Sequence, residues 1–324
     1  MQIPWRYRFL QSLINFRDWF IAQLVFLSLK LLRLIPMDSA IRIFERFARW
    51  LGPKLKRHQV ALDNLELAFP EKSTDELAAI GSAVWGNMGA IFAEYAQLED
   101  ICRDRLDVVI HPAIRTFQDP AHHQAVFVSA HFGNWELLAA AISRSQVPVT
   151  AVFTPLQNPL LDARLARQRR HLGCHLLPRD ESMRPLIREL AQGRSIGLVM
   201  DQRVDSGHPV PMFGIDKQTT LIPARLALRH DAELVACRCD RQPDGRFRIE
   251  FFPPIVADDE SASEVDQAIQ MSRQVNALFE QWITDRPADW FCTNRRWPKS
   301  AVAAPSASAH KATDSHGGVT YPKA

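Results

Sequence analysis

The sequence predicts an α/β fold: a mixed, largely parallel central sheet flanked by helices and preceded by an N-terminal hydrophobic helix. Two observations lead to this prediction. From about residue 106, short runs rich in β-branched and aromatic residues alternate with longer helical patterns. Such alternation is typical of a parallel sheet that helices cover on both faces. Before residue 100 the patterns are helical throughout, and the first 36 residues are basic and strongly apolar.

We expect residues 1–36 to form an uncleaved membrane anchor. Residues 1–60 contain eleven Lys or Arg and only three acidic residues, so they carry +8 and leave −5 on the remainder. Basic charge interleaved with aromatic and aliphatic residues favours an anionic membrane surface over nucleic acid. The longest uncharged run, Trp19 to Leu29, has 11 residues, fewer than the roughly 18–20 of a spanning helix. The anchor should therefore lie in, or dip into, the cytoplasmic leaflet. A buried core helix is the alternative.

Residues 37–100 should be a mainly helical lead-in. Apolar residues recur at helical spacing over 41–51 and over 56–69, and Pro70 ends the second run. Ser73 and Glu76 have the spacing of a capping box, which predicts a helix that starts there and runs to about Tyr95.

The region from 106 to 285 contains the sheet. Strands are predicted at 106–110, 125–130, 147–153, 174–178, 195–201, 233–240 and 246–252. Helices are predicted at 134–144, 158–172, 181–193, about 220–230 and 262–285. The turn at 243–245 makes the last two strands an antiparallel pair. We expect one domain over 37–299, followed by a disordered tail over 300–324 that is rich in Ala, Ser, His, Gly and Pro.

The polar segment between the strand at 125–130 and the following helix has the features of a catalytic site. His131 and Glu136 stand at the carboxyl end of a strand, where open α/β sheets bind ligands. We expect Glu136 to turn back to His131 and orient its ring, so that His131 deprotonates an acceptor hydroxyl as a general base. Gly133 should let a donor backbone approach closely, and Asn134 should cap the helix. The alternative is a loop histidine beside a glutamate that complements the helix dipole.

A second polar set follows the strand at 195–201. Asp201 is expected to bind a polar substrate group or support an arginine, and Gln202 lies beside it. Four arginines occupy the predicted helix 158–172, where a solvated face is the default and a phosphate contact requires one of them to point inward. They are Arg164, Arg167, Arg169 and Arg170.

The segment Gly193 to Gly197 matches the GxSxG pattern of serine hydrolases, yet its context is reversed. That motif needs a strand before the serine and a helix after it, whereas here a helix comes first and a strand follows. Ser195 is therefore interpreted as a turn residue.

No cofactor is predicted. The five cysteines include no CxxC pair, which makes a zinc site or a disulfide framework improbable and favours buried free thiols. No metal-ligand spacing and no nucleotide-binding motif is present.

Taken together, these motifs resemble those of the bacterial lipid A biosynthesis acyltransferases of the lauroyl/myristoyl type, within the lysophospholipid acyltransferase superfamily. The similarity extends over about residues 10–298 and is carried by several blocks in the family's order. These are NLELAFPE (64–71), AHFGNWE (130–136), NPLLD (158–162), MDQ (200–202), VPMFG (210–214) and FCTNRRW (291–297). The family often has a histidine where this chain has Asn294, so no role is transferred to that position.

The resemblance implies a glycerolipid-acyltransferase-like fold and catalysis by His131 and Glu136. It implies supporting roles for Asp201 and for an arginine after NPLLD, by spacing Arg169, with Arg167 as the weaker candidate. The donor in such proteins is usually an acyl carrier protein thioester, and the acceptor is a hydroxyl of a lipid A precursor. Members sit on the cytoplasmic face of the bacterial inner membrane.

Two further functions stay open at this point. One is acyl transfer from acyl-CoA to a lysophospholipid or another membrane lipid. The other is an inactive membrane scaffold that keeps the fold, against which the intact pair of His131 and Glu136 argues. A nucleic-acid protein is disfavoured, since no recognised binding motif accompanies the basic N-terminus.

Overall fold

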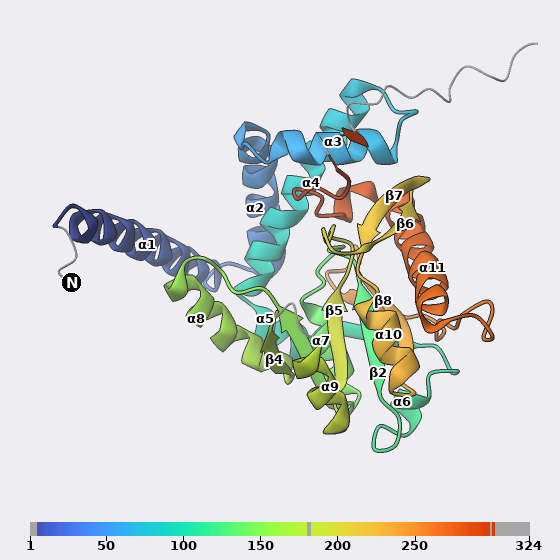
Figure 1. Cartoon of the computed structure of the whole chain (residues 1–324). Coiled ribbons are helices and arrows are strands. Elements are labelled where there is room, and N and C mark those ends of the chain that lie inside the picture. Colours follow the sequence, from blue (N-terminus) through green and yellow to red (C-terminus); the bar gives the residue numbers. More distant parts are fainter. Residues whose placement is uncertain (1–4, 180–182, 299, 302–324) are drawn as a thin grey trace, which may run out of the picture.

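The structure is a computed structural model that describes residues 5–179, 183–298, 300 and 301, with side chains from residue 13 onward (Figure 1). Most of the predicted tail lies outside the described residues. The helical lead-in is present and comprises α1 (Trp5–Leu32), α2 (Met37–Leu51), α3 (His58–Ala68), α4 (Thr74–Tyr95) and α5 (Leu98–Asp104), with a 3₁₀ turn, η1 (Gly52–Lys54).

The predicted start and end of α4 are confirmed. The Ser73 side chain accepts a hydrogen bond from the backbone N–H of Glu76, and the Glu76 carboxylate accepts one from the backbone N–H of Ser73. This reciprocal capping box satisfies two donors that the first turn of a helix otherwise leaves unpaired. The helix then runs to Tyr95, as expected.

The central sheet has seven strands in the order β1-β9-β8-β2-β5-β3-β4. Every neighbouring pair is parallel except β8 and β9, which are antiparallel. The predicted mixed, largely parallel sheet is thus confirmed. Its strands are β1 (Leu106–Ile110), β2 (Ala125–Ser129), β3 (Val149–Phe153), β4 (His175–Pro178), β5 (Ser195–Val199), β8 (Glu233–Arg241) and β9 (Phe247–Phe251).

Helices cover both faces of this sheet (Figure 1). They are α6 (Arg115–Gln118), α7 (Leu137–Arg144), α8 (Pro159–Arg169), α9 (Arg184–Ala191), α10 (Ile222–Arg229) and α11 (Glu264–Asp285), with the 3₁₀ turns η2 (Arg170–Leu172) and η3 (Pro287–Asp289). Strand β2 is buried along its whole length. Val126 and Val128 pack in one hydrophobic cluster and Phe127 in the other, because successive side chains of a strand point to opposite faces.

One hairpin, β6 (His208–Met212) with β7 (Ile215–Thr219), was not predicted. Pro209 and Pro211 argue against a strand, because proline cannot donate to a ladder. In an isolated two-stranded pair the outer edge of each strand has no neighbouring strand. A proline whose backbone nitrogen faces that edge therefore removes no hydrogen bond from the ladder. The turn residues Phe213 and Gly214 have φ of +52° and +70°, as two-residue hairpin turns require.

The expectation that Ser195 is a turn residue is wrong. Ser195 is the first residue of β5 and is buried. Its hydroxyl accepts a hydrogen bond from the backbone N–H of Ala125 at 3.0 Å. The serine therefore joins two strands and is no nucleophile.

Helix α1 projects away from the body of the molecule (Figure 1). Only a few of its side chains pack inward, among them Ala22, Leu29 and Leu32. Neither α1 nor another helix in the described part of the chain has the length and apolar character needed to cross a bilayer. The predicted helix is present, and most of its large apolar side chains face outward.

Candidate active site

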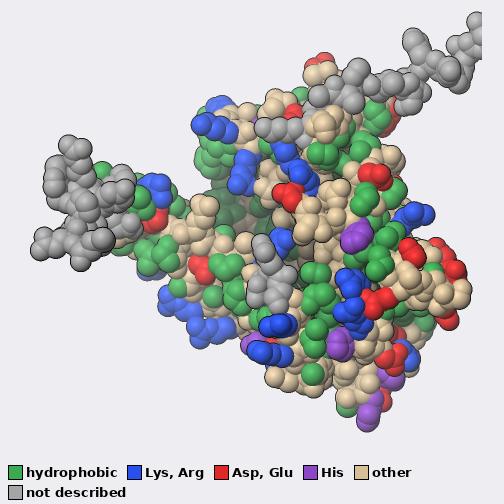
Figure 2. All heavy atoms as spheres, in the orientation of Figure 1, with side chains coloured by type: hydrophobic (Ala, Val, Ile, Leu, Met, Phe, Trp, Pro, Cys, Tyr) green, Lys and Arg blue, Asp and Glu red, His purple; other side chains and the backbone are tan. Residues whose placement is uncertain are grey.

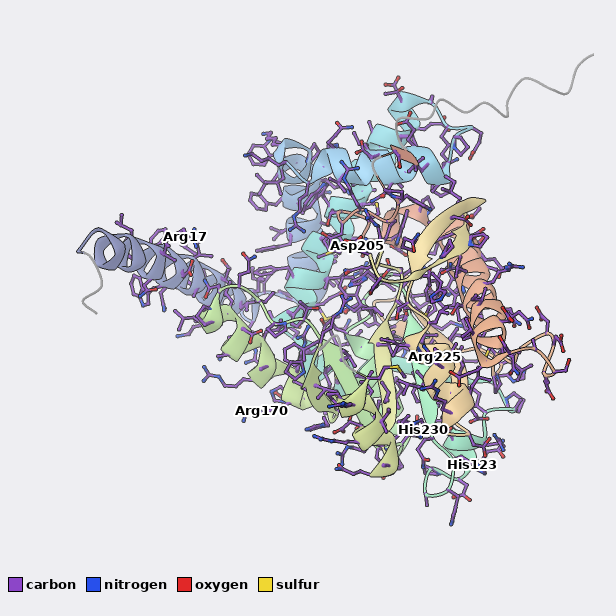
Figure 3. The ribbon with its side chains drawn as sticks, viewed as in Figure 1. Arg17, His123, Arg170, Asp205, Arg225 and His230 are labelled. Carbon is purple, nitrogen blue, oxygen red and sulfur yellow. The ribbon has the colours of Figure 1, made fainter. Side chains whose placement is uncertain are left out.

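The site forms where the carboxyl ends of two neighbouring parallel strands meet. Strands β2 and β5 pair with Ser129 opposite Val199, and the backbone N–H of Met200 donates to the carbonyl of Ser129 at 2.9 Å. His131 lies two residues after Ser129, and Asp201 lies two residues after Val199. Parallel pairing therefore brings these two side chains together although 70 residues separate them. Figure 3 labels Asp205, which follows Asp201 in the same loop and marks this end of the sheet.

The His131 ring is held by Asp201. Nδ1 of His131 lies 2.6 Å from Oδ1 of Asp201. The Asp201 side chain is fully buried, whereas that of His131 is 13 % exposed. A carboxylate accepts hydrogen bonds only, so Nδ1 carries the proton and Nε2 keeps its lone pair. Nε2 is therefore the ring nitrogen that can accept a hydrogen bond.

The second oxygen of Asp201 binds two residues from the C-terminal segment. Oδ2 accepts from Nε and a terminal nitrogen of Arg296, at 3.0 and 2.6 Å, and from the indole N–H of Trp290 at 3.1 Å. Burial alone would raise the pKa of Asp201, yet the charges of Arg296 and His131 outweigh it and hold that pKa well below its ordinary value. Asp201 is therefore a carboxylate whose two oxygens have separate tasks.

Lys217 on β7 completes the buried charge cluster. Its ammonium group donates to the backbone carbonyl of Asp201 at 3.2 Å, and the side chain is fully buried. Burial lowers the pKa of Lys217 to about 7, although the charge of Asp201 opposes this shift. The hairpin that sequence patterns missed thus places a titratable group behind the site.

The segment that supplies Trp290 and Arg296 runs beside the turn after β2. The backbone N–H of Phe291 donates to the carbonyl of His131 at 2.8 Å, and that of Gly133 donates to the carbonyl of Asp289 at 3.0 Å. Phe132 and Trp290 form an isolated antiparallel bridge. The histidine and the residues that hold its aspartate are therefore joined through backbone hydrogen bonds.

Asn64 on α3, in the NLELAFPE block, fastens this C-terminal segment. Its amide donates to the carbonyls of Cys292 and Asn294 at 2.7 and 2.8 Å, and its oxygen accepts from the backbone N–H of Arg296 at 3.1 Å. The Asn294 side chain itself accepts from Arg57 at 2.7 Å. The NLELAFPE block, although far from His131 in the sequence, thus positions Arg296.

Gly133 is needed for a different reason from the one expected. Its φ is +54°, and a Cβ built there would lie 2.0 Å from the carbonyl oxygen of Cys239 on β8. The backbone that closely approaches Gly133 is thus that of strand β8 of the sheet. The turn needs glycine both for its left-handed backbone and for this contact.

Glu136 pairs with Arg169 instead of His131. Its two carboxylate oxygens accept from Nε and a terminal nitrogen of Arg169 at 2.9 and 2.5 Å. No hydrogen bond joins Glu136 to His131 within the residues that the structure describes. The orienting role expected for Glu136 is occupied by Asp201, because the turn after β2 carries Glu136 toward the end of α8.

Tyr95 and Phe153 complete the surroundings of this ion pair. Tyr95 lies beside Glu136 and Arg169, and burial together with the charge of Glu136 raises its pKa well above the ordinary value. Burial would lower the pKa of Arg169, but its bonds to Glu136 outweigh that effect and raise it. The guanidinium of Arg169 lies 5.4 Å from the ring centroid of Phe153. Both charges of the pair are thus locked in place.

Asn134 is not the helix cap that we expected. Helix α7 begins at Leu137 with Glu136 at the N-cap position. The Asn134 amide instead donates to the buried carboxylate of Glu94 at 2.7 Å, and Glu94 also accepts from Arg241 at 2.5 Å. Asn134 therefore connects the turn after β2 to α4 and, through Glu94, to β8.

The remaining candidates divide between the site and the surface. Nε2 of Gln202 lies 3.3 Å from Nε2 of His131, so this side chain is at the reactive nitrogen. The indole of Trp135 packs edge-on to the His131 ring at 5.0 Å. Arg167 is exposed, as is Arg170, which Figure 3 places on the outer side of the molecule.

The cysteines and acidic residues give no sign of a metal centre. In the described residues no three His, Cys, Asp or Glu side chains gather as metal ligands would. All five cysteines are free thiols, and burial raises the pKa of several, Cys102 and Cys174 each to about 11. The predicted buried free thiols are confirmed for all but the half-buried Cys174.

Comparison with known proteins gives the family. Residues 7–299 match the family model described as bacterial lipid A biosynthesis acyltransferase. The chain belongs to this family. It is 26% identical over 267 residues to a lipid A biosynthesis myristoyltransferase of Escherichia coli (strain K12), covering 78% of each chain. It is 24% identical over 263 residues to lipid A biosynthesis acyltransferase 2 of Shigella flexneri, covering 77% of this chain and 83% of the other.

Membership of the lipid A acyltransferases makes the chain an enzyme of acyl transfer onto lipid A and confirms the resemblance that its motifs indicated. Sequence reasoning nevertheless missed three residues of this acyltransferase that surround Asp201. Arg296 was part of the block FCTNRRW (291–297) but had no assigned role, and Trp290 and Lys217 were unnoticed. No local signal reveals them, because each reaches Asp201 from a segment more than ten residues away in sequence.

Proposed function

We propose that this enzyme transfers a fatty acyl chain from an acyl carrier protein thioester to a hydroxyl of a lipid A precursor, with His131 as the general base. The observation that carries the proposal is the pair of His131 with the buried, anionic Asp201, which leaves Nε2 free to accept a proton. Membership of the lipid A acyltransferase family supports the class of acceptor.

In this mechanism Nε2 of His131 takes the proton of the acceptor hydroxyl. The oxygen attacks the thioester carbonyl, the carbon–sulfur bond breaks, and the imidazolium returns the proton to the departing thiolate. The products are an ester and a free thiol, so no covalent enzyme intermediate is needed. The amide nitrogen of Gln202 contacts Nε2, and we propose that the acceptor hydroxyl displaces it and that the displaced amide then orients the hydroxyl.

Asp201 is proposed to orient the imidazole and to stabilise the imidazolium that forms. Its charge persists in a fully buried position because Arg296 and Trp290 occupy Oδ2 and leave Oδ1 to His131. An orienting carboxylate of this kind contributes about 10⁴ in rate in the serine proteases. Arg296 and Trp290 therefore act as positioning residues.

Glu136 is proposed to act through Arg169. The bidentate pair holds the guanidinium over Phe153, and both side chains keep 12% exposure. A partly exposed arginine fixed in this way is suited to an anionic group of the donor or the acceptor. Arg167 lies on the exposed side and is the weaker candidate for that contact.

We also propose that the enzyme works at the cytoplasmic face of the bacterial inner membrane and is attached through α1. The support is a set of large apolar side chains on α1 that are about half exposed: Phe16, Trp19, Phe20, Leu24, Leu27 and Leu31. Together with the basic charge of this region they fit an interfacial helix. The membrane then presents the glycolipid acceptor to the site.

The experiment that tests the proposal compares lipids from cells with the gene, without it, and with His131→Ala or Glu136→Ala. Mass spectrometry should show lipid A that lacks one secondary acyl chain in the deletion strain, restored by the natural gene. Purified His131→Ala should lose at least about a hundredfold in kcat, the scale of general-base catalysis, with an unchanged circular dichroism spectrum. Glu136→Ala should also lose most turnover, because Arg169 is released.

Unchanged lipid A in the deletion strain would refute the acceptor and turn attention to lysophospholipids or other membrane lipids. Equal rates with acyl-CoA and acyl carrier protein as donors would refute the preference for the carrier protein. Near-normal turnover in both alanine variants would refute the mechanism, whereas absence of turnover in the natural protein with either donor would favour an inactive scaffold.

A further inference from the structure

Helix α2 has two apolar faces, and only one of them is covered. Met37, Ala40 and Ile41 are buried on the inner face, which packs on α4. On the outer face Ile43, Phe47 and Trp50 are 52, 50 and 60% exposed. Their spacing of four and three residues puts them in one stripe along the helix. Large exposed side chains gathered in this way indicate a contact surface, unlike singly scattered ones.

Basic residues border this stripe on one side. Arg42, Arg46 and Arg49 follow the same spacing one position earlier and are all exposed. Lys54 lies with its ammonium 3.5 Å from the ring centroid of Trp50. The acidic residues of α2, Asp38 and Glu45, project from roughly the opposite side of the helix by its periodicity, and Glu45 forms an ion pair with Arg49 at 2.9 Å. Arg42 and Arg46 therefore provide the positive charge beside the stripe, and the acidic residues face away from it.

We infer that α2 lies on a lipid surface as a second membrane contact, with the stripe in the interfacial layer and with Arg42 and Arg46 at lipid phosphates. This inference rests on the proposed membrane attachment through α1 and adds a separate element to it. An apolar stripe with aromatic rings and a basic border is the pattern of helices that lie in the interface of anionic membranes.

The surface continues from α1 to α2. The short connection between them contains Leu34, which is 79% exposed, and α1 itself carries the outward apolar side chains described above. Hydrophobic and basic side chains lie side by side along α1 and over the part of the molecule where Figure 1 places α2 (Figure 2). One membrane can therefore contact both helices at the same end of the molecule.

A second copy of the chain fits this surface less well. Three side chains of this kind at about half exposure offer roughly 300 Å², well below the roughly 800 Å² that each partner buries in a stable complex. Residues 37–57 also carry six basic and two acidic residues, so two such faces would repel each other. Anionic lipid is complementary to the same charge.

Co-sedimentation of the purified full-length protein with vesicles tests the inference. The vesicles contain phosphatidylcholine with or without phosphatidylglycerol, and no acyl donor or acceptor is present. The variant Phe47→Ser, Trp50→Ser should bind phosphatidylglycerol vesicles about tenfold or more weakly than the natural protein, because two interfacial rings are lost. The control Val256→Ser removes a 63% exposed apolar side chain outside the stripe and should bind normally. Binding by the double variant within twofold of normal would overturn the inference.

A conservative variant guards against a folding defect. With brominated phosphatidylcholine in the vesicles, Trp50→Phe should lower the fraction of tryptophan fluorescence that the bromines quench, since Trp50 then no longer contributes. An unchanged quenched fraction would overturn the inference. A shift from dimer to monomer in the double variant, seen by light scattering without loss of vesicle binding, would assign the stripe to a second copy.

The result is separable from the proposed function. An enzyme that acylates a different lipid still gives the vesicle result, because the assay contains no substrate. Conversely, the double variant should keep normal turnover with donor and acceptor dispersed in detergent, and its loss there would show that the stripe serves the reaction and not the membrane.

Discussion

At the scale of single residues, the site depends on one carboxylate, that of Asp201, whose two oxygens bind different partners. Oδ1 of Asp201 holds His131, while Oδ2 is saturated by Arg296 and Trp290. A buried ion pair is weak evidence for stability, but removing one partner leaves the other charge uncompensated. In the proposed mechanism, the fully buried pair of Asp201 with Arg296 keeps Oδ1 of Asp201 available to the His131 ring.

The variant Asp201→Asn should lower kcat by roughly 10³–10⁴, because the imidazolium loses its stabilising charge. Glu136→Gln should lower kcat by a smaller factor, because Glu136 is proposed to act only through Arg169. Steady-state rates of the two variants under the same conditions distinguish them. Leaving Arg296 unpaired costs about 3–5 kcal/mol, so thermal unfolding must confirm a folded variant. A larger loss in Glu136→Gln than in Asp201→Asn would restore the orienting role to Glu136.

Lys217 provides a pH dependence of stability. Its pKa of about 7 in the folded protein lies below the roughly 10.4 of an unfolded chain. Between these values the unfolded state binds more protons, so the free energy of unfolding of the natural protein rises with pH. Lys217→Met lacks this effect, and its stability relative to the natural protein should fall by about 2–3 kcal/mol between about pH 6 and about pH 9. Urea unfolding at both pH values measures this, and a constant difference would contradict it.

At the scale of elements, three segments build the site: the turn after β2, the loop after β5 and the segment after α11. The first two meet because β2 and β5 are parallel neighbours. The third is fastened to the first through the Phe132–Trp290 bridge and to α3 through Asn64. The position of His131 therefore depends on backbone packing as much as on its own ion pair.

Gly133→Ala should test this dependence. The left-handed backbone and a Cβ only 2.0 Å from the carbonyl of Cys239 should lower the free energy of unfolding by about 2–4 kcal/mol and reduce turnover. Gly214→Ala is the matched control, since its φ is +70° with open space around the Cβ, and should cost about 1 kcal/mol. Equal losses in the two variants, measured by chemical unfolding, would show that the β8 contact is unimportant.

At the scale of the whole molecule, apolar and basic surface is concentrated at one end. Helix α1 stands out from the body there and exposes most of its large apolar side chains. If the proposed function holds, the acceptor is embedded in a lipid layer, and a projecting interfacial helix would hold the site next to it.

Charges on the outer face of α1 should release the protein from membranes. Phe20→Glu with Leu24→Glu changes two side chains that are each 50% exposed, so the fold should persist while burial in lipid becomes unfavourable. Fractionation of cells should move the variant from the membrane pellet to the supernatant. Val265→Glu, at an exposed apolar position on α11, should stay in the pellet. Retention of the α1 variant would count against attachment through this helix.

The sequence by itself determined much of the fold, because the signals involved are local. Alternating strand and helix patterns indicated the mixed sheet, and the Ser73–Glu76 capping box marked the start of α4. His131 was found because a polar residue after a buried strand is visible in sequence. The hairpin β6–β7 escaped notice, since its prolines mimic a loop.

Only the tertiary structure decided which acidic residue contacts His131. Glu136 is five positions away and was the natural choice, yet the turn at Gly133 directs it to Arg169. Asp201 is 70 residues away and reaches the ring because β2 and β5 are paired in parallel register. Strand pairing is a non-local property, and no spacing along the chain encodes it. The same reason hid Trp290, Arg296 and Lys217, which meet at Asp201 from two parts of the fold, the segment after α11 and the strand β7.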